Sequence, residues 1–284
     1  MRALSGKKDS GFSADALIWH ADVRRMLLTQ KAIAEGGRAM IFSVAQLADV
    51  MVNSLLEGDA KTHQDYDNRL GFYTPILKGF LTELGLEAAN LGMQVLGGHG
   101  YIHEHGMEQI ARDARIATLY EGTTGIQALD LLGRKVLLAT RGKCVRDFSG
   151  LMLSFSRRHV FAGGAIGKMA RCLIRRALEW NVLTARIMLR ASKDRDVVGS
   201  ASVDYLMYSG YMMMAYFWAL QAAKAADLLA SGQGKESAAF YRAKIQTAEF
   251  YFARLLPRAT GHKIGALAPT RSLMQMDKNS FAFD

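Results

Sequence analysis

The chain has 284 residues, half of them apolar and only three of them proline. A chain of this length can bury a sizeable core, and this composition excludes intrinsic disorder and favours long uninterrupted helices. The formal charge of +10 at pH 7 suits nucleic acid, an anionic membrane or a phosphorylated substrate equally, because each responds to a positive field. The basic residues form no long Lys/Arg block, so we expect no nucleic-acid partner.

The cysteines and the N-terminal residues point to an intracellular compartment. Cys144 and Cys172 lie in arginine-rich sequence without the spacing of a metal site or a disulfide framework. The first twenty residues carry charges and no apolar run, which excludes an ordinary secretory signal. We therefore expect a cytoplasmic protein.

The predicted elements begin with a loop over residues 1–20, followed by one long amphipathic helix from residue 22 to about residue 56, where apolar residues follow a three-four spacing. Gly36 and Gly37 lower the propensity of this helix, and we expect their small size to allow close packing of another helix. Residues 58–71 are polar and interrupt the pattern. Thr74 and Pro75 then offer a cap and a first-turn proline, which predicts that a second long helix begins there.

The next predicted break follows this second helix, which Gly97 and Gly98 are expected to end before a loop over residues 99–106. Residues 107–119 predict a shorter helix and residues 120–122 a break. Thr123 or Thr124 is expected to cap another helix that runs past Lys135. Glu121 is thereby placed between two helices, where free backbone donors lie beside its carboxylate, a geometry that suits a ligand.

The second half of the chain is also predicted to be helical. Residues 142–167 mix charge, serine and glycine, and we expect a domain boundary there. Helices are expected near residues 166–192, 201–229 and 236–256, with a turn at residues 231–234. The uncharged stretch 205–223 is almost long enough to cross a bilayer, but its tyrosines, Ser209 and Gln221 suit a helix buried among helices better. We predict an all-α fold with no integral membrane segment.

One segment, residues 94–135, carries a family resemblance. Its sequence, QVLGGHGYIHEHGMEQIARDARIATLYEGTTGIQALDLLGRK, resembles the signature region of acyl-CoA dehydrogenases. Three other segments are also similar to that family: DVRRMLLTQKAIAEGGRAM (22–40), TPILKGF (74–80) and FYRAKIQTAEFYFARLLP (240–257). The last one resembles the subgroup with an added C-terminal helical domain, the 3-methylmercaptopropionyl-CoA dehydrogenase-like enzymes. The resemblance implies an acyl-CoA dehydrogenase C-terminal helical bundle over residues 1–147 and an additional C-terminal helical domain over residues 148–284.

The resemblance also implies a reaction, the α,β-dehydrogenation of an acyl-CoA thioester with FAD as cofactor. Glu121 in LYEGTTG matches the carboxylate that removes the α-proton, with its backbone N–H as one donor to the thioester oxygen, and Tyr120 and Gly122 are implied to contact the substrate. A thioester α-proton is only weakly acidic, so its base needs a dry site and accurate placement. Burial beside Leu119 and Tyr120 would disfavour the charged form of the carboxyl group.

Two groups of residues match the family's contacts to FAD. The first group is implied to touch the adenine end of FAD, from the neighbouring subunit of a dimer: Gln94, Val95, Leu96, Gly97 and Gly98. The second group is implied to lie near the flavin phosphate and ribityl chain, where a helix N-terminus favours an anion: Thr123, Thr124 and Gly125. The same residues also suit ordinary helix caps. Gly125 departs from the glutamine common at this position in shorter relatives.

Several other patterns are interpreted as structural. The histidines at positions 99, 103 and 105 have an irregular spacing in a glycine-rich loop, so we expect no metal. Arg112 and Asp113 are expected to form a salt bridge within their helix. The methionines at positions 212–214 are expected in the core. Glu104 and Glu108 are weaker candidates for the base.

The resemblance further implies an acyl-CoA substrate, electron-transfer flavoprotein as electron acceptor, and a homodimer or a dimer of dimers. Complete family members also have an N-terminal helical domain and a middle β-domain, which this sequence lacks, so we expect an inactive fragment of such an enzyme. Two alternatives come from other classes. The basic pI suits a DNA-associated flavoprotein of the adaptive-response branch, and a non-catalytic oligomerisation module would tolerate a change at Glu121.

Overall fold

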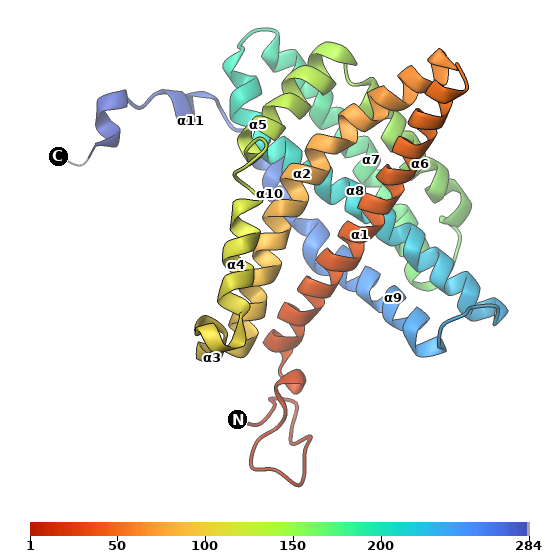
Figure 1. Ribbon diagram of the computed structural model, residues 1–284, viewed down its shortest axis with the longest axis vertical. Helices are drawn as coiled ribbons and strands as arrows, with labels where there is room; N and C mark the ends of the chain where they lie inside the picture. Colours follow the sequence, from red (N-terminus) through yellow and green to blue (C-terminus); the bar gives the residue numbers. More distant parts are fainter. Residues whose placement is uncertain (283–284) are drawn as a thin grey trace.

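The computed structural model describes residues 1–282, and every regular element in that range is helical, which confirms the all-α fold class (Figure 1). In chain order the α-helices are α1 (Ala21–Leu56), α2 (Ala60–Leu96), α3 (Gly98–Tyr101), α4 (Met107–Ile116), α5 (Thr124–Leu129), α6 (Lys143–His159), α7 (Gly164–Ala191), α8 (Asp196–Ser231), α9 (Ala238–Phe250), α10 (Ala259–Ala266) and α11 (Arg271–Met274). The longest helices pack into one bundle with several shorter ones against it, whereas α11 lies on a segment that extends away from the bundle (Figure 1).

Tighter and wider helical turns join these helices. Two π-helical segments continue α5 and α9: η3 (Asp130–Ala139) and η4 (Tyr251–Leu255). Single 3₁₀ turns occur at η1 (Leu17–Trp19), η2 (His103–His105), η5 (Leu256–Arg258) and η6 (Lys278–Phe281). The predicted helix past Lys135 is confirmed, and so are the helices expected from about residues 166, 201 and 236. The expected loop at 99–106 contains the short turns of α3 and η2.

The first predicted helix is confirmed as α1, and its glycine pair permits close packing as expected. A Cβ atom on Gly36 would lie 2.6 Å from Nε1 of Trp218 on α8. That nitrogen donates a hydrogen bond to the carbonyl oxygen of Ala32, at 3.1 Å. A side chain at position 36 would therefore displace a buried tryptophan that joins the two helices.

The predicted start of α2 at Thr74 is wrong, because the helix begins at Ala60. Asp59 caps it, since its carboxylate accepts a hydrogen bond from the backbone N–H of Thr62 at 3.0 Å. Pro75 lies inside the helix, where it removes one backbone donor, and the Thr74 hydroxyl donates to the carbonyl of Leu70 at 2.8 Å. The polar stretch is the outer end of a long helix that reaches beyond the core, so it needs no continuous apolar stripe.

The domain boundary expected over residues 142–167 falls in a segment that is largely helical. Helix α6 occupies most of this range and buries Val145, Phe148 and Met152 in the main core. Because the outer face of α6 is polar, the average composition of the segment does not reveal this buried apolar stripe. The helix runs across the division expected between residues 147 and 148, so the assignment of two domains, 1–147 and 148–284, remains a prediction.

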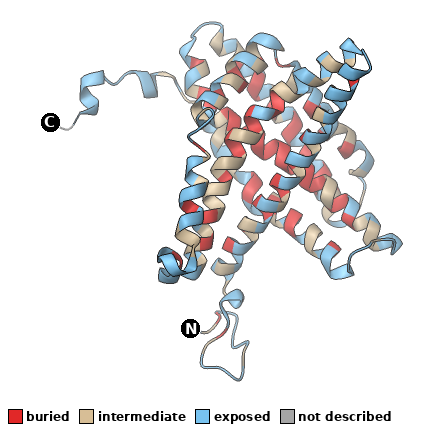
Figure 2. Ribbon diagram, viewed as in Figure 1, coloured by how far each residue is buried: buried red, intermediate tan, exposed pale blue. Residues whose placement is uncertain are grey.

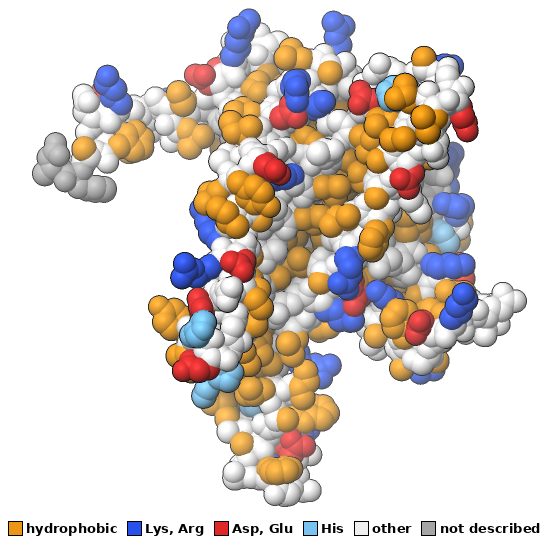
Figure 3. All heavy atoms as spheres, in the orientation of Figure 1, with side chains coloured by type: hydrophobic (Ala, Val, Ile, Leu, Met, Phe, Trp, Pro, Cys, Tyr) orange, Lys and Arg blue, Asp and Glu red, His pale blue; other side chains and the backbone are white. Residues whose placement is uncertain are grey.

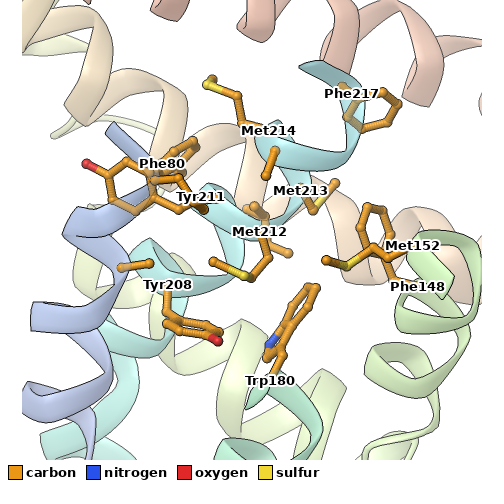
Figure 4. Close-up of a cluster of buried hydrophobic side chains, with 14 of the residues drawn as sticks. Phe80, Phe148, Met152, Trp180, Tyr208, Tyr211, Met212, Met213, Met214 and Phe217 are labelled. Carbon is orange, nitrogen blue, oxygen red and sulfur yellow. The ribbon is translucent and has the colours of Figure 1, made fainter. Parts of the chain in front are cut away.

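Helix α8 forms the middle of the core (Figure 2). The stretch 205–223 is a buried helix, as expected. The Tyr205 hydroxyl lies 2.6 Å from that of Thr184, whereas the buried side-chain nitrogen of Gln221 has no hydrogen-bond partner among the described residues. The three methionines at positions 212–214 are fully buried, which confirms their expected place. Met212 and Met213 lie among aromatic and sulfur-containing side chains of α6 and α7 (Figure 4). Met214 points to the opposite side, toward Gly36 of α1.

One helix of the described chain, α1, is long and apolar enough to cross a membrane by length and composition. Only 17% of its most apolar window is buried. It nevertheless has a buried stripe against α2, and Glu35 on α1 forms a 2.8 Å ion pair with Lys244 of α9. Such features fit a bundle helix with an apolar outer face. A single helix of this length and composition is weak support for a membrane span. The outer apolar residues are Leu27, Ile41, Phe42, Val50, Val52, Leu55 and Leu56.

Two glycines allow α2 and α8 to cross closely. A Cβ atom on Gly79 of α2 would lie 2.8 Å from Leu206, and one on Gly210 of α8 would overlap the ring of Phe80. Phe80 is fully buried and packs edge-on against Tyr211, with ring centroids 4.9 Å apart, so it cannot withdraw.

We expect Gly210→Ala to lower the free energy of unfolding by about 2–3 kcal/mol, because the added methyl group overpacks this crossing. The matched control is Gly85→Ala in α2, where nothing lies within 4 Å of the added carbon. This control should raise stability by about 0.5–1 kcal/mol through helix propensity. Urea denaturation of both variants measures the difference, and equal effects would contradict the close crossing.

A partly buried ionic cluster joins α7, α8 and α10. The carboxylate of Glu179 accepts hydrogen bonds from Arg176 at 2.7 Å, Tyr208 at 3.0 Å and Lys263 at 3.2 Å. Burial raises the pKa of Glu179, but the three donors outweigh burial and hold the pKa below its ordinary value of 4.5.

Because the pKa is lower in the folded chain than in the unfolded chain, the Glu179 carboxylate contributes its full stability above pH 4.5. This contribution is lost as the pH falls through the lowered value. We expect Glu179→Gln to cost about 1–2 kcal/mol at pH 7, and the cost should shrink below pH 4.5. Asp147→Asn, which removes an exposed pair with Lys143, is the control and should cost less than about 0.5 kcal/mol. Denaturation curves at several pH values test this.

Candidate active site at the turn between α4 and α5

The turn between α4 and α5 carries the candidate base in a strained backbone conformation. Glu121 has φ of +52° and Gly122 has φ of +92°. A left-handed conformation costs an ordinary L-residue about 1–2 kcal/mol, and among the described non-glycine residues only Arg141 shares it. The side chain of Gln127 also lies close to Gly122, since a Cβ atom at position 122 would be 2.7 Å from its amide nitrogen.

Side chains from α2 and α5 hold this turn. Nζ of Lys78 donates hydrogen bonds to the carbonyl oxygens of Ala117 at 2.8 Å and Gly122 at 2.7 Å. The Thr124 hydroxyl donates to the carboxylate of Glu83 at 2.5 Å. Gln127 donates to the carbonyl oxygen of Glu121 at 3.2 Å. These contacts explain how the structure maintains the costly conformation of Glu121.

The predicted cap at the start of α5 is confirmed at Thr123, whose hydroxyl accepts from the backbone N–H of Ile126 at 3.3 Å. Within the described chain, no group accepts from the backbone N–H of Glu121 or of Gly122. Free N–H groups beside a carboxylate can bind an oxygen atom of a ligand. The predicted site residues 120–125 are consecutive in the chain, and they form this turn and the start of α5.

Glu121 was expected to be buried, but this chain does not bury it. Glu121 is exposed, and the side chains expected to cover it are exposed too, Leu119 to 45% and Tyr120 to 52%. The reason is that α2 supports the turn from one side only, while the other side has no neighbouring helix. Apolar residues near the turn are equally uncovered: Ile116, Ile126 and Leu129. An exposed group of this kind is typical of a surface that another body covers.

The other predicted cofactor group lies away from this turn. Residues Gln94 to Gly98 form the end of α2 and the start of α3, and most of them are exposed. Lys78 and Gln94 belong to the same helix and are about 24 Å apart at its usual rise per residue. A shallow groove of about 450 Å³ runs between the two places, lined by Glu83, Leu86, Glu87, Asn90, Leu91 and Gln94. Within a single chain, therefore, the two predicted sets of FAD-contacting residues do not form one site.

One structural expectation near the site turns out differently. Arg112 and Asp113 form no ion pair in the described chain, because adjacent residues of a helix point in diverging directions and both side chains face solvent. Among residues 1–282, no group of three or more His, Cys, Asp or Glu side chains is arranged to hold a metal ion. His103 instead lies 3.4 Å from Glu108.

Sequence reasoning missed Lys78, Glu83 and Gln127 as parts of this site. Lys78 and Glu83 lie on the helix predicted from TPILKGF, but their partners are about forty positions further along the chain. No spacing rule connects residues so far apart. For these two residues only the packing of α2 against the turn reveals the contacts, whereas Gln127 on α5 reaches the carbonyl oxygen of a near neighbour, Glu121.

Comparisons with known proteins identify the family. Residues 7–137 match the family model described as acyl-CoA dehydrogenase, C-terminal domain, and residues 149–277 match the one described as acetyl-CoA dehydrogenase C-terminal like. The two matches together cover most of the chain, which therefore belongs to the acyl-CoA dehydrogenase family. It corresponds to the C-terminal helical region of the subgroup that includes 3-methylmercaptopropionyl-CoA dehydrogenase.

Individual relatives support this placement. The 3-methylmercaptopropionyl-CoA dehydrogenase of Ruegeria pomeroyi is 36% identical over 89% of this chain and 42% of that protein. The broad-specificity linear acyl-CoA dehydrogenase FadE5 of Mycobacterium tuberculosis is 32% identical over 92% of this chain and 43% of that protein. The chain thus spans about two fifths of the length of these relatives. An acyl-CoA dehydrogenase from Bacillus anthracis, solved with FAD, has a similar fold, with a TM-score of 0.64 and 15% identity over 86% of this chain and 41% of that chain.

The strain at Glu121 leads to a stability prediction. Glu121→Gly should raise the free energy of unfolding by about 0.5–1 kcal/mol, because glycine adopts a positive φ without the penalty of a side chain. The matched control is Glu249→Gly at an exposed position of α9, where glycine should lower stability by about 0.5–1 kcal/mol. Thermal and urea unfolding measure both. A loss of stability in both variants would show that the turn stores no strain.

Proposed function

We propose that this chain is the C-terminal part of an FAD-dependent acyl-CoA dehydrogenase in which Glu121 removes the α-proton of an acyl-CoA thioester. The observation that supports the assignment most directly is the left-handed conformation of Glu121, maintained by hydrogen bonds to the carbonyl groups around it. Strained residues persist where the surrounding structure holds them, and they cluster at functional sites. The proposal also draws on the family membership and on the match of LYEGTTG to the family's base.

The turn contains the groups that this chemistry needs. A carboxylate can accept the α-proton, and the negative charge that develops on the thioester oxygen requires fixed donors. The free backbone N–H groups of Glu121 and Gly122 can act as such donors. The apolar side chains of Leu119 and Tyr120 would exclude water once the site is covered, which strengthens both interactions.

The residues of this chain fit part of FAD. The backbone around Gly97 and Gly98 is open, since nothing lies within 4 Å of a Cβ atom placed on either glycine, and a cofactor can approach it closely. Thr123 and Thr124 offer a helix start with hydroxyl groups beside Glu121. When bound, FAD would accept the hydride from the β-carbon of the substrate. The chain spans about two fifths of the length of its relatives, so we propose that the wider flavin pocket lies outside it and that the isolated chain is inactive.

We also propose that the enzyme is a homodimer or a dimer of dimers. The separation of Gln94 from the Glu121 turn, about 24 Å along α2, fits an arrangement in which each group serves a different FAD molecule. The apolar outer face of α1 offers a surface for such assembly. Electron-transfer flavoprotein is the proposed electron acceptor.

The basic charge does not favour the DNA-associated alternative. On the face shown in Figure 3, acidic side chains lie among the Lys and Arg side chains, and no continuous basic surface appears. Duplex binding depends on such a surface, because affinity grows with the number of phosphate groups that are neutralised.

Glu121→Gln tests the proposed base. In the flavin-loaded protein that combines this chain with the flavin-binding domains, we expect the variant to bleach the flavin with acyl-CoA at least about 10³-fold more slowly, because the amide cannot accept the proton. Glu104→Gln, on the exposed η2 turn, is the matched control and should keep normal rates. Normal turnover in Glu121→Gln would overturn the assignment and would favour the non-catalytic module.

A further inference from the structure

Lys78 forms an unusual contact for a lysine, because its charge is directed to backbone carbonyl groups. The side chain is partly buried, and within the described chain no carboxylate lies within salt-bridge distance of it. Its two hydrogen bonds reach the carbonyl of Ala117, at the end of α4, and that of Gly122, just before α5. A single ammonium group therefore ties together the two sides of the turn that carries Glu121.

The surroundings of Lys78 suit this contact in two ways. The carbonyl of Ala117 belongs to the C-terminal end of α4, where the helix dipole favours a positive charge. The ammonium group also lies 5.7 Å from the ring centre of Tyr120, the residue before Glu121, within the range of a cation–π interaction. Each of these interactions depends on the charge as well as on the hydrogen-bonding protons.

The anchor of Lys78 is rigid. The next residue, Gly79, contacts Leu206 at the close crossing of α2 and α8, so the backbone that carries Lys78 is held by the core. Further along the same helix, Glu83 accepts the hydrogen bond of Thr124. Helix α2 thus holds the turn before Glu121, at residue 117, and after it, at residues 122 and 124.

We propose that Lys78 is a positioning residue, which holds the α4–α5 turn so that Glu121 keeps its left-handed conformation and its aim toward the substrate. The catalytic part of this inference rests on the proposed function of Glu121, whereas the structural part does not. Without the two hydrogen bonds, the strained turn can relax to an ordinary conformation and carry the carboxylate away from its place. A misplacement of about 1 Å can cost a factor of about 10² in rate.

The structural part is tested on the 284-residue chain by cleavage with a glutamate-specific protease. Cleavage requires local opening of the chain, so its rate reports how firmly the turn is held. In Lys78→Met we expect cleavage after Glu121 to become at least about tenfold faster relative to cleavage after Glu236, an exposed site in the turn before α9. Lys78→Arg, which keeps charge and donors, should restore most of the resistance. Lys61→Met, at the exposed first turn of α2, is the matched control and should change neither site.

The catalytic part is tested in the flavin-loaded protein with its flavin-binding domains. Lys78→Met should lower kcat by about 10–100-fold with KM changed less than about threefold, and Lys78→Arg should recover most of kcat. Added to Glu121→Gln, it should cause no further loss, because the two residues act on one step.

The outcomes separate the two proposals. Unchanged protease cleavage in Lys78→Met would overturn the structural part, and faster cleavage with unchanged kcat would overturn the positioning role. If Glu121→Gln turned over normally, the proposed base would fail, while the cleavage result would still decide whether Lys78 holds the turn.

Discussion

The close crossing of α2 and α8 is the constraint on which the rest of the structure depends. Gly79 and Gly210 leave no room for side chains there, and Phe80 and Leu206 fill the space that remains. Protein interiors pack densely enough that such a contact has one acceptable geometry. Because Lys78 precedes Gly79 directly and Glu83 lies about one turn further on, the position of the α4–α5 turn follows from the packing of the core.

The turn that carries Glu121 is therefore held by α2 on one side and exposed to solvent on the other. Glu121, its free backbone N–H groups and the neighbouring apolar side chains all face outward in this chain. Under the proposed function, removal of a weakly acidic proton needs a dry environment, and this chain leaves Glu121 exposed. The relatives are more than twice as long as this chain, so in them the matching region accounts for less than half of the protein. Because α2 already holds the turn in place, less free energy is needed to organise the complete site when another body covers it.

Other exposed apolar surfaces of the chain also suit contact with another body. The apolar face of α1 and the uncovered residues around Glu121 are separate exposed areas on a chain whose interior is well packed. The groove along α2 connects the turn with Gln94, where the resemblance places contacts to a second cofactor molecule. These exposed surfaces lie on a chain whose core is well packed, which fits the proposal that further parts of the protein cover them.

The sequence by itself determined much of the local structure. Three-four spacing predicted α1, and helix start and turn signals predicted α7, α8 and α9. Glycine was expected to end α2 at Gly97, and the break between helices at Glu121 was also predicted, because each of these depends on residues close together in the chain. The start of α2 at Ala60, the helix α6, the exposure of Glu121 and the contact of Lys78 with Gly122 were decided by tertiary structure. For Lys78 and for the buried face of α6 the deciding neighbours lie far away in sequence, so a local pattern carries no record of them, whereas the cap of α2 at Asp59 is a local signal that the apolar pattern did not reveal.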